Sequence, residues 1–212
     1  SVGLGSVGLG SVGLGSVGVD VLLVESLQHG ETGALAELVH KYQHRIYRVA
    51  MQITRNHEDA SDVTQETFLK VYESIYSLRR KAAFETWIYR IAVNKATNLV
   101  KRHHRRCESS LSTIRENDIH FGLRRNSNLV NIPHLNVEKQ ELRKTVTQAV
   151  NSLSLKHRTV IILYEFEGLT HTEIASILRC SEGTVRSRLH YARKQLRDRL
   201  QSYIDPVSMD LR

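Results

Sequence analysis

Residues 170–199 read THTEIASILRCSEGTVRSRLHYARKQLRDR, and this stretch decides the fold of the C-terminal part of the chain. Thr170 and Glu173 have the spacing of a capping box, in which each side chain satisfies a backbone N–H at a helix start. After a three-residue break, Ser181 stands where a second N-cap is expected. Apolar residues follow each cap at helical spacing. Two short helices in this register predict a helix-turn-helix.

The second of these helices has a polar, basic face opposite its apolar seam. Arginines near a helix N-terminus suit the guanine edges of the DNA major groove, and later cations suit phosphates. The alternative is an ordinary solvated face on a surface helix. The face consists of Arg186, Ser187, Arg188, His190, Arg193, Lys194 and Arg197.

Three further apolar stripes between residues 30 and 106 predict a compact three-helix module. The first stripe spans residues 35–53, the second begins after the N-cap candidate Asn56, and the third begins near Ala83. More helices are expected at about residues 138–151 and 154–164. No alternating strand pattern competes with them, so the predicted fold is all-α.

The remaining segments set the predicted boundaries. Residues 1–20 repeat Ser-Val-Gly-Leu-Gly, and a five-residue period advances about 140° around a helix, so it builds no apolar face. We therefore expect residues 1–20 to be disordered or a cloning remnant, outside the fold. Residues 107–137 lose periodicity and predict a flexible linker. The predicted organisation is a first module at 21–106, a second at 138–203, and a frayed tail at 204–212.

Charge and cysteine usage narrow the function classes. The formal charge of +8 attracts polyanions without identifying them. Cys107 and Cys180 form no paired motif, so ordinary reduced thiols are expected, with a redox or zinc role of Cys107, His103 and His104 as the alternative. No catalytic or phosphate-binding motif appears, so we expect neither enzymatic activity, nor a small-molecule substrate, a cofactor or a bound metal.

Two surfaces of the first module carry candidate binding residues. Arg90, Asn94, Thr97 and Lys101 share one helical face, which suits a phosphate backbone and hydrogen bonds to bases. A basic helix end that merely complements its own dipole is the alternative. The preceding helix presents an acidic face beside an apolar residue, which fits either solvated surface or a protein partner. That face consists of Asp62, Gln65, Glu66, Leu69 and Lys70.

Four strings together resemble the extracytoplasmic-function sigma factors of bacteria. They are DVTQETFLKVY at 62–72, FETWIYRIAVN at 84–94, GLTHTEIA at 168–175 and GTVRSRL at 183–189. The resemblance implies that the first module is sigma region 2, which docks on the clamp of the largest subunit of core RNA polymerase and melts the −10 promoter element. It implies that the second module is region 4, which reads the −35 element as duplex.

The resemblance also implies three sets of site residues. The polymerase-binding set is Asp62, Gln65, Glu66 and Leu69. The −10 set, which would capture an unpaired base, is Leu78, Arg79, Arg80, Lys81, Arg90, Asn94 and Lys101. The −35 set on the recognition helix is Thr184, Arg186, Ser187, Arg188, His190, Tyr191 and Lys194.

The chain departs from the family pattern at three positions. Thr64 stands where an apolar residue is common, and Tyr191 stands where arginine is frequent. Arg179 replaces a common glycine after the first helix of the helix-turn-helix, so either that residue is strained in a left-handed conformation or the turn differs.

The implied partners are core RNA polymerase, promoter DNA and an anti-sigma factor. The implied location is the bacterial cytoplasm, without membrane insertion, although an anti-sigma factor could sequester the chain at the membrane. A stand-alone helix-turn-helix regulator is the alternative function, but it leaves residues 30–106 unexplained.

Overall fold

The computed structural model describes residues 12–111 and 137–209, and over these ranges it contains eight α-helices and no strand. The all-α prediction is therefore confirmed. The N-terminal group consists of α1 (Val12–Gln28), α2 (Thr32–Thr54), α3 (His57–Ser74) and α4 (Phe84–Leu111), and the C-terminal group of α5 (Val137–Asn151), α6 (Leu155–Ile161), α7 (His171–Leu178) and α8 (Glu182–Met209). Short 3₁₀ turns at Ile75–Ser77 and Lys81–Ala83 join α3 to α4, and a π-helical turn at Ile162–Phe166 extends α6.

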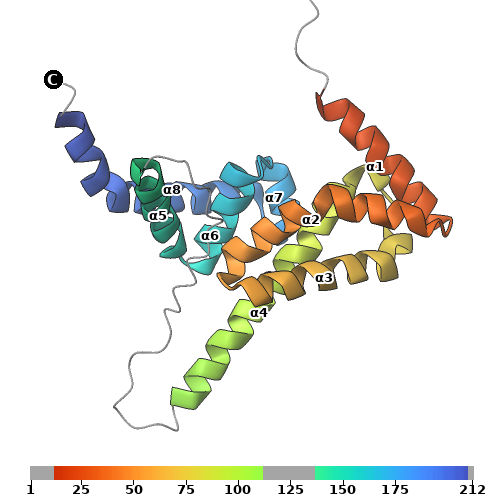
Figure 1. The fold of residues 1–212 in the computed structure, drawn as a ribbon, viewed down its shortest axis with the longest axis horizontal. Helices are drawn as coiled ribbons and strands as arrows, with labels where there is room; N and C mark the ends of the chain where they lie inside the picture. Colours follow the sequence, from red (N-terminus) through yellow and green to blue (C-terminus); the bar gives the residue numbers. More distant parts are fainter. Residues whose placement is uncertain (1–11, 112–136, 210–212) are drawn as a thin grey trace, which may run out of the picture.

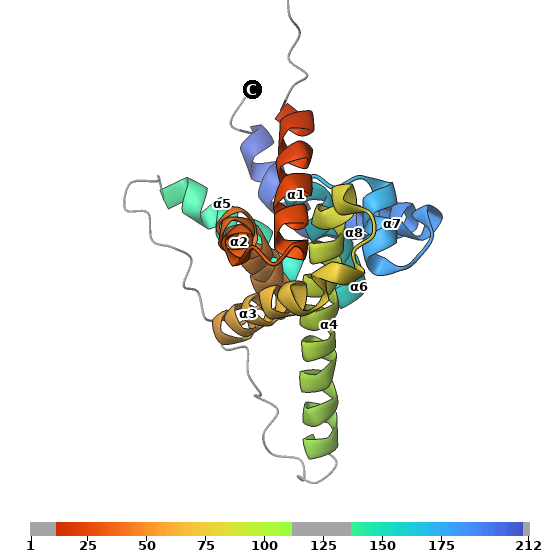
Figure 2. The same cartoon turned by 90° about the vertical axis from the view of Figure 1, so that its right-hand side faces the viewer.

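Four helices, rather than the predicted three, build the first module. Their buried faces contain Leu38, Ile46, Phe84 and Ile88, and α1 adds Val24. Figures 1 and 2 show α1 lying against this group, and the C-terminal half of α4 projecting beyond it. The Asn56 side chain accepts hydrogen bonds from the N–H groups of Glu58 and Asp59, so the predicted N-cap of α3 is confirmed.

The expectation for residues 1–20 is wrong for its last nine residues, because α1 begins at Val12. Asp20 is buried, and its carboxylate accepts hydrogen bonds from Tyr42 Oη and Lys41 Nζ, both at 2.6 Å. A buried carboxylate with two donors is stable inside a fold, and its partners come from α2. Residues 1–11 lie outside the described part.

Three other predicted boundaries differ from the structure. The helix α4 continues to Leu111 instead of ending at residue 106, and α5 begins at Val137. The helix α8 continues to Met209, beyond the predicted end at 203. Most of the predicted linker, residues 112–136, lies outside the described residues.

Asp20→Asn is expected to lower the free energy of unfolding of the first module by about 1–2 kcal/mol, because a neutral amide accepts weaker hydrogen bonds than a carboxylate. Trp87 is the only tryptophan of the chain and lies in this module, so its fluorescence during urea denaturation reports the change. Asp62→Asn is the matched control, because Asp62 is exposed. Equal stability of both variants would show that the buried pairings of Asp20 contribute nothing.

The two groups of helices pack against each other. The helix α7 lies beside α4, and α6 with its π-helical turn lies beside α2. The prediction of two modules is confirmed, and the two modules are in contact in this structure.

Candidate DNA-reading and polymerase-binding surfaces

The helix-turn-helix forms as predicted from its caps. The Thr170 N–H donates to Glu173 Oε2 at 2.8 Å, and Thr170 Oγ1 accepts from the Glu173 N–H at 3.3 Å, which completes the capping box of α7. Ser181 Oγ accepts from the Thr184 N–H at 3.1 Å at the start of α8. Val185 and Leu189 are buried against α7, so the opposite face of α8 is held toward solvent.

The turn between α7 and α8 is strained at Arg179. This residue has φ 51° and ψ 51°, the left-handed conformation, and its N–H donates to the Ala175 carbonyl. The first alternative raised by the sequence, a strained residue in an ordinary turn, is therefore confirmed. A side chain at this conformation costs about 1 kcal/mol, and glycine avoids most of that cost.

Arg179→Gly is expected to raise the free energy of unfolding by about 1 kcal/mol, because glycine adopts positive φ without a steric penalty. Circular dichroism during thermal unfolding measures the change. Arg179→Ala is the control, since it removes the same long side chain but keeps the Cβ atom. An equal gain in both variants would mean that the guanidinium, and not the backbone conformation, is unfavourable.

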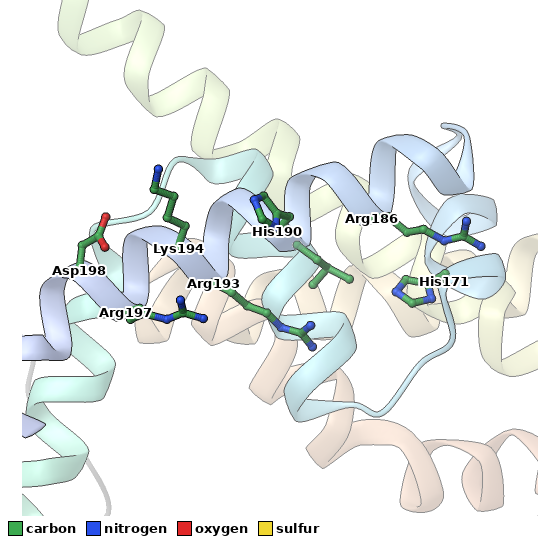
Figure 3. A pocket seen from close by; sticks show the side chains of 8 residues that line it. His171, Arg186, His190, Arg193, Lys194, Arg197 and Asp198 are labelled. Atoms are coloured by element: carbon green, nitrogen blue, oxygen red, sulfur yellow. The ribbon is translucent and has the colours of Figure 1, made fainter.

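A basic hollow of about 530 Å³ runs along α8. Figure 3 shows its side chains spread along the helix, with His171 of α7 beside Arg186. The hollow brings together three residues of the predicted −35 set, Arg186, His190 and Lys194. The hollow is also lined by three residues that the −35 set omitted, His171, Arg193 and Arg197. Arg193 and Arg197 belong to the basic face predicted from the sequence.

Arg193 is held in position by the π-helical turn. Its Nε and Nη2 atoms donate to Glu165 Oε1 at 3.0 and 2.7 Å, and its guanidinium lies 5.0 Å from the centre of the Tyr164 ring. The hydrogen bond to Glu165 raises the pKa of Arg193. Among the described residues, Arg186 pairs only with Glu182, in an exposed i,i+4 pair at 3.3 Å, a kind of contact that contributes little energy.

The other members of the −35 set differ in exposure. Ser187 is exposed, and Thr184 and Arg188 are half-buried. Tyr191 is 54% exposed, and its ring stacks on that of His157 with centroids 6.4 Å apart. The phenol is therefore exposed and has an aromatic neighbour on α6, but it is not among the residues that line the hollow.

The predicted −10 residues divide into an exposed part and an anchored part. Asn94 and Lys101 of α4 are exposed, as are Arg79 and Arg80 of the loop before it. Leu78, in contrast, is buried in the module, so its side chain anchors the loop.

Two cations of the −10 set already have partners. Lys81 Nζ pairs with Glu25 Oε1 of α1 at 2.7 Å. Arg90 Nη2 donates to Ser176 Oγ of α7 at 2.8 Å. The second contact lies between modules, which the helical spacing of Arg90 could not indicate.

The α3 face has the exposure expected from its sequence. Asp62, Gln65 and Glu66 are exposed, and Leu69 is 62% exposed, a large apolar side chain facing solvent. Tyr72 of α3 and Tyr76 of the following 3₁₀ turn are also exposed and extend this stripe. Isolated exposed leucines are common, but an apolar stripe flanked by acids is typical of a protein-binding surface.

The contact between the modules centres on Glu167, which the sequence analysis did not single out. Its side chain is 1% exposed, and its carboxylate lies 3.3 Å from Arg45 Nε and 3.1 Å from Arg48 Nη2. It also accepts a hydrogen bond from Tyr89 Oη at 2.5 Å. Burial and, after it, this hydrogen bond raise the pKa of Tyr89. One carboxylate of the second module thus joins α2 and α4 of the first.

Arg158 of α6 is a second inter-module group. Its Nη2 donates to the Ile53 carbonyl at 2.8 Å, at the C-terminal end of α2, where carbonyl groups lack helical partners. Burial and the nearby Arg55 lower the pKa of Arg158 to about 10. The guanidinium therefore caps a helix of the other module at a desolvation cost.

The structure describes the side chain of one of the two cysteines. Cys180 is a free, half-buried thiol. The Cys107 side chain lies outside the described residues, so the redox or zinc role raised for Cys107, His103 and His104 stays a prediction. Among the residues that the structure does describe, no cluster of three metal-ligating side chains occurs.

Comparison with known proteins identifies the family. The Sigma-70 region 2 family matches residues 38–106, and the Sigma-70, region 4 family matches residues 143–196. The RNA polymerase sigma-H factor of Pseudomonas aeruginosa is 36% identical over 182 residues, covering 86% of this chain and 94% of that protein. The ECF RNA polymerase sigma-E factor of Haemophilus influenzae is 39% identical over 186 residues, covering 86% and 95%. The chain belongs to the extracytoplasmic-function sigma factors.

Solved structures show the same fold. The structure of CnrH in complex with the cytosolic domain of CnrY has a TM-score of 0.63 at 21% identity, covering 87% of this chain and 98% of that one. The sigma factor RpoE of Bartonella quintana, solved with the anti-sigma factor NepR, has a TM-score of 0.60 at 22% identity, covering 78% and 96%.

Membership of the family fixes the general activity. The chain acts in transcription initiation as a promoter-directing subunit of RNA polymerase, and its first and second modules are regions 2 and 4. None of its described helices is both long enough and apolar enough to cross a membrane.

Proposed function

We propose that this sigma factor reads a −35 duplex with α8 and an opened −10 element with α4 and the loop before it, while α3 docks on the polymerase clamp. The observation that carries the proposal is the division of the exposed surface among three elements. Basic side chains gather on α8 and on α4 with its loop, whereas α3 presents acids beside exposed apolar residues.

The proposed −35 contacts follow from the chemistry of α8. Arg186 stands in the first turns of the helix and is 66% exposed, so its planar guanidinium can reach the O6 and N7 atoms of a guanine. Lys194 and Arg197 stand further along and suit phosphates. Arg193 and His171 join this proposed set because they line the same hollow.

The proposed −10 contacts use Arg79, Arg80, Asn94 and Lys101, which are exposed. An unpaired base can be held by stacking and by hydrogen bonds to its edge, and these side chains offer amide and guanidinium groups for both. Leu78 supports the loop from within. Arg90 becomes available once Ser176 moves away.

An anti-sigma factor as partner, the location and the lack of a catalytic group are further parts of the proposal. CnrH and the Bartonella quintana RpoE were solved with the cytosolic domain of CnrY and the anti-sigma factor NepR, respectively, and a comparable anti-sigma factor is proposed for this chain. The proposed location is the bacterial cytoplasm. The chain is proposed to have no catalytic group, because phosphodiester chemistry belongs to the polymerase.

Run-off transcription tests the proposal. The full chain is mixed with bacterial core RNA polymerase and a library of linear templates randomised across the −35 and −10 regions. The expected result is initiation from a subset of templates that share both elements. Failure to initiate from any template would overturn the proposal, and duplex binding without polymerase would favour the stand-alone regulator.

A further inference from the structure

The last turn of α1 holds the loop between α3 and α4. Gln28 Nε2 donates to the Ile75 carbonyl at 2.8 Å and to the Leu78 carbonyl at 3.2 Å. Figures 1 and 2 both show the C-terminal end of α1 beside this loop. One side chain thus binds the backbone just before the loop and at its first residue.

The orientation of the Gln28 amide follows from chemistry. Its NH₂ group has two hydrogens, and each has one carbonyl oxygen to reach. The flipped amide would bring its own oxygen against the same two carbonyl oxygens, which have no hydrogen to donate. Only a donor therefore satisfies this site, and a carboxylate of the same size does not.

A second contact from α1 fixes the other end of the loop. Glu25 stands three residues before Gln28, on the same side of α1, and its Oε1 atom accepts from Lys81 Nζ at 2.7 Å. This hydrogen bond lowers the pKa of Glu25. Within the described part of the chain, the hydrogen bonds of residues 78–81 that involve side chains all lead to α1.

The helix that supplies these contacts is itself anchored independently. The buried pairings of Asp20 fix the middle of α1 on α2, and Leu27 is buried beside Gln28. Arg80 meanwhile lines a groove of about 400 Å³ with Trp87 and Arg90 of α4, and neither Glu25 nor Gln28 reaches it. The loop is thus supported from α1, while its arginines stay exposed.

We propose that Gln28, assisted by Glu25, is a positioning residue for recognition of the −10 element, because it sets the backbone of the loop that presents Arg79 and Arg80 to the unpaired base. This inference rests on the proposed role of that loop. A misplaced reading group weakens recognition sharply, since hydrogen bonds to a base edge depend on distance and direction.

The test uses holoenzyme assembled from core polymerase and the full chain. The probe is a promoter recovered from the template library, in duplex form and with its −10 element opened as a mismatched bubble that offers each of the four bases. Gln28→Ala and Gln28→Glu are expected to reduce discrimination between the preferred and other bases by about tenfold or more. Leu22→Ala is the matched control on α1, because Leu22 is 65% exposed.

Three readouts separate positioning from general stability. The readouts are base discrimination at the −10 element, affinity for core polymerase and affinity for a −35 duplex. The two affinities should stay at the wild-type level in both Gln28 variants. Unchanged base discrimination would overturn the proposal, and an equal loss in all three readouts would reduce Gln28 to a stability role. Should Gln28→Ala fail to fold, base discrimination by the isosteric Gln28→Glu variant tests the proposal.

Hydrogen exchange distinguishes this inference from the proposed function. The amides of Leu78 and Ala83, which donate to the Ile75 and Arg80 carbonyls, should exchange faster in both Gln28 variants than in wild type or Leu22→Ala, whether or not any template is transcribed. If the wild-type holoenzyme initiates nowhere, the proposed function fails, but the support of the loop by α1 is still measured. Unchanged exchange would show that the loop holds itself.

Discussion

Glu167→Ala is expected to separate the two modules and to increase the radius of gyration of the free chain. The wild-type carboxylate is 1% exposed and serves Arg45, Arg48 and Tyr89 together. Its removal leaves the buried Tyr89 hydroxyl without an acceptor and brings two guanidinium groups together without their shared anion. Breaking a fully buried pair by removing one partner costs about 3–5 kcal/mol. The cost here is smaller, because Arg45 and Arg48 are 34% and 57% exposed and Arg45 keeps its pair with Glu85 at 2.7 Å, but it falls on the contact between modules.

Small-angle X-ray scattering on the full chain without polymerase measures this change. Glu165→Ala is the matched control, because it removes the same residue type two positions away. The partner of Glu165 is Arg193, within the second module. An unchanged radius in Glu167→Ala would mean that the other contacts, including Arg90 with Ser176 and Arg158 with the Ile53 carbonyl, hold the modules together without Glu167. An increase in both variants would point to damage of the π-helical turn.

Arg186→Ala is expected to weaken binding of the holoenzyme to its preferred −35 duplex by about 1–3 kcal/mol, or roughly five- to 150-fold. The guanidinium is 66% exposed, and its pair with Glu182 is weak enough to exchange for a base. The loss should be confined to duplexes with the preferred base at one position, because a bidentate contact distinguishes that base from the other three.

Lys194→Ala provides the comparison for this experiment. A phosphate contact carries no sequence information, so its loss should weaken binding to all duplexes alike and lower the salt dependence by about one counterion. Fluorescence anisotropy at several salt concentrations separates the two patterns. If Arg186→Ala weakened binding to all duplexes equally, the role of Arg186 would be electrostatic, and the proposal that it reads a base would be wrong.

Local chemistry explains what the sequence could predict. Thr170, Ser181 and Asn56 each cap a helix through an atom two or three residues away, so their role depends on little else. The exposure of Asp62 and Leu69 follows likewise from one helical stripe. Such features survive in any fold that keeps the helices.

Long-range pairing explains what the sequence could not predict. The repeat before Asp20 has no apolar face, yet α1 forms because its later residues, including Val24, pack on the module. Glu167 meets Tyr89 across 78 positions, and no local pattern distinguishes it from a solvated acid before Gly168. In the sequence, Arg158 cannot be distinguished from an exposed cation, because its acceptor, the Ile53 carbonyl at the end of α2, is 105 positions away.

The contact between Arg90 and Ser176 bears on how tightly the free chain can hold a promoter. The −35 and −10 elements are about 25 base pairs apart, or roughly 85 Å of duplex at 3.4 Å per pair. In the structure, Arg90 of the first module and Ser176 of the second are hydrogen-bonded at 2.8 Å. Only molecules whose modules have parted can span both elements, and the observed dissociation constant is the intrinsic one divided by that fraction. Substitutions that strengthen the Glu167 contact would thus weaken promoter binding without altering any residue that faces DNA.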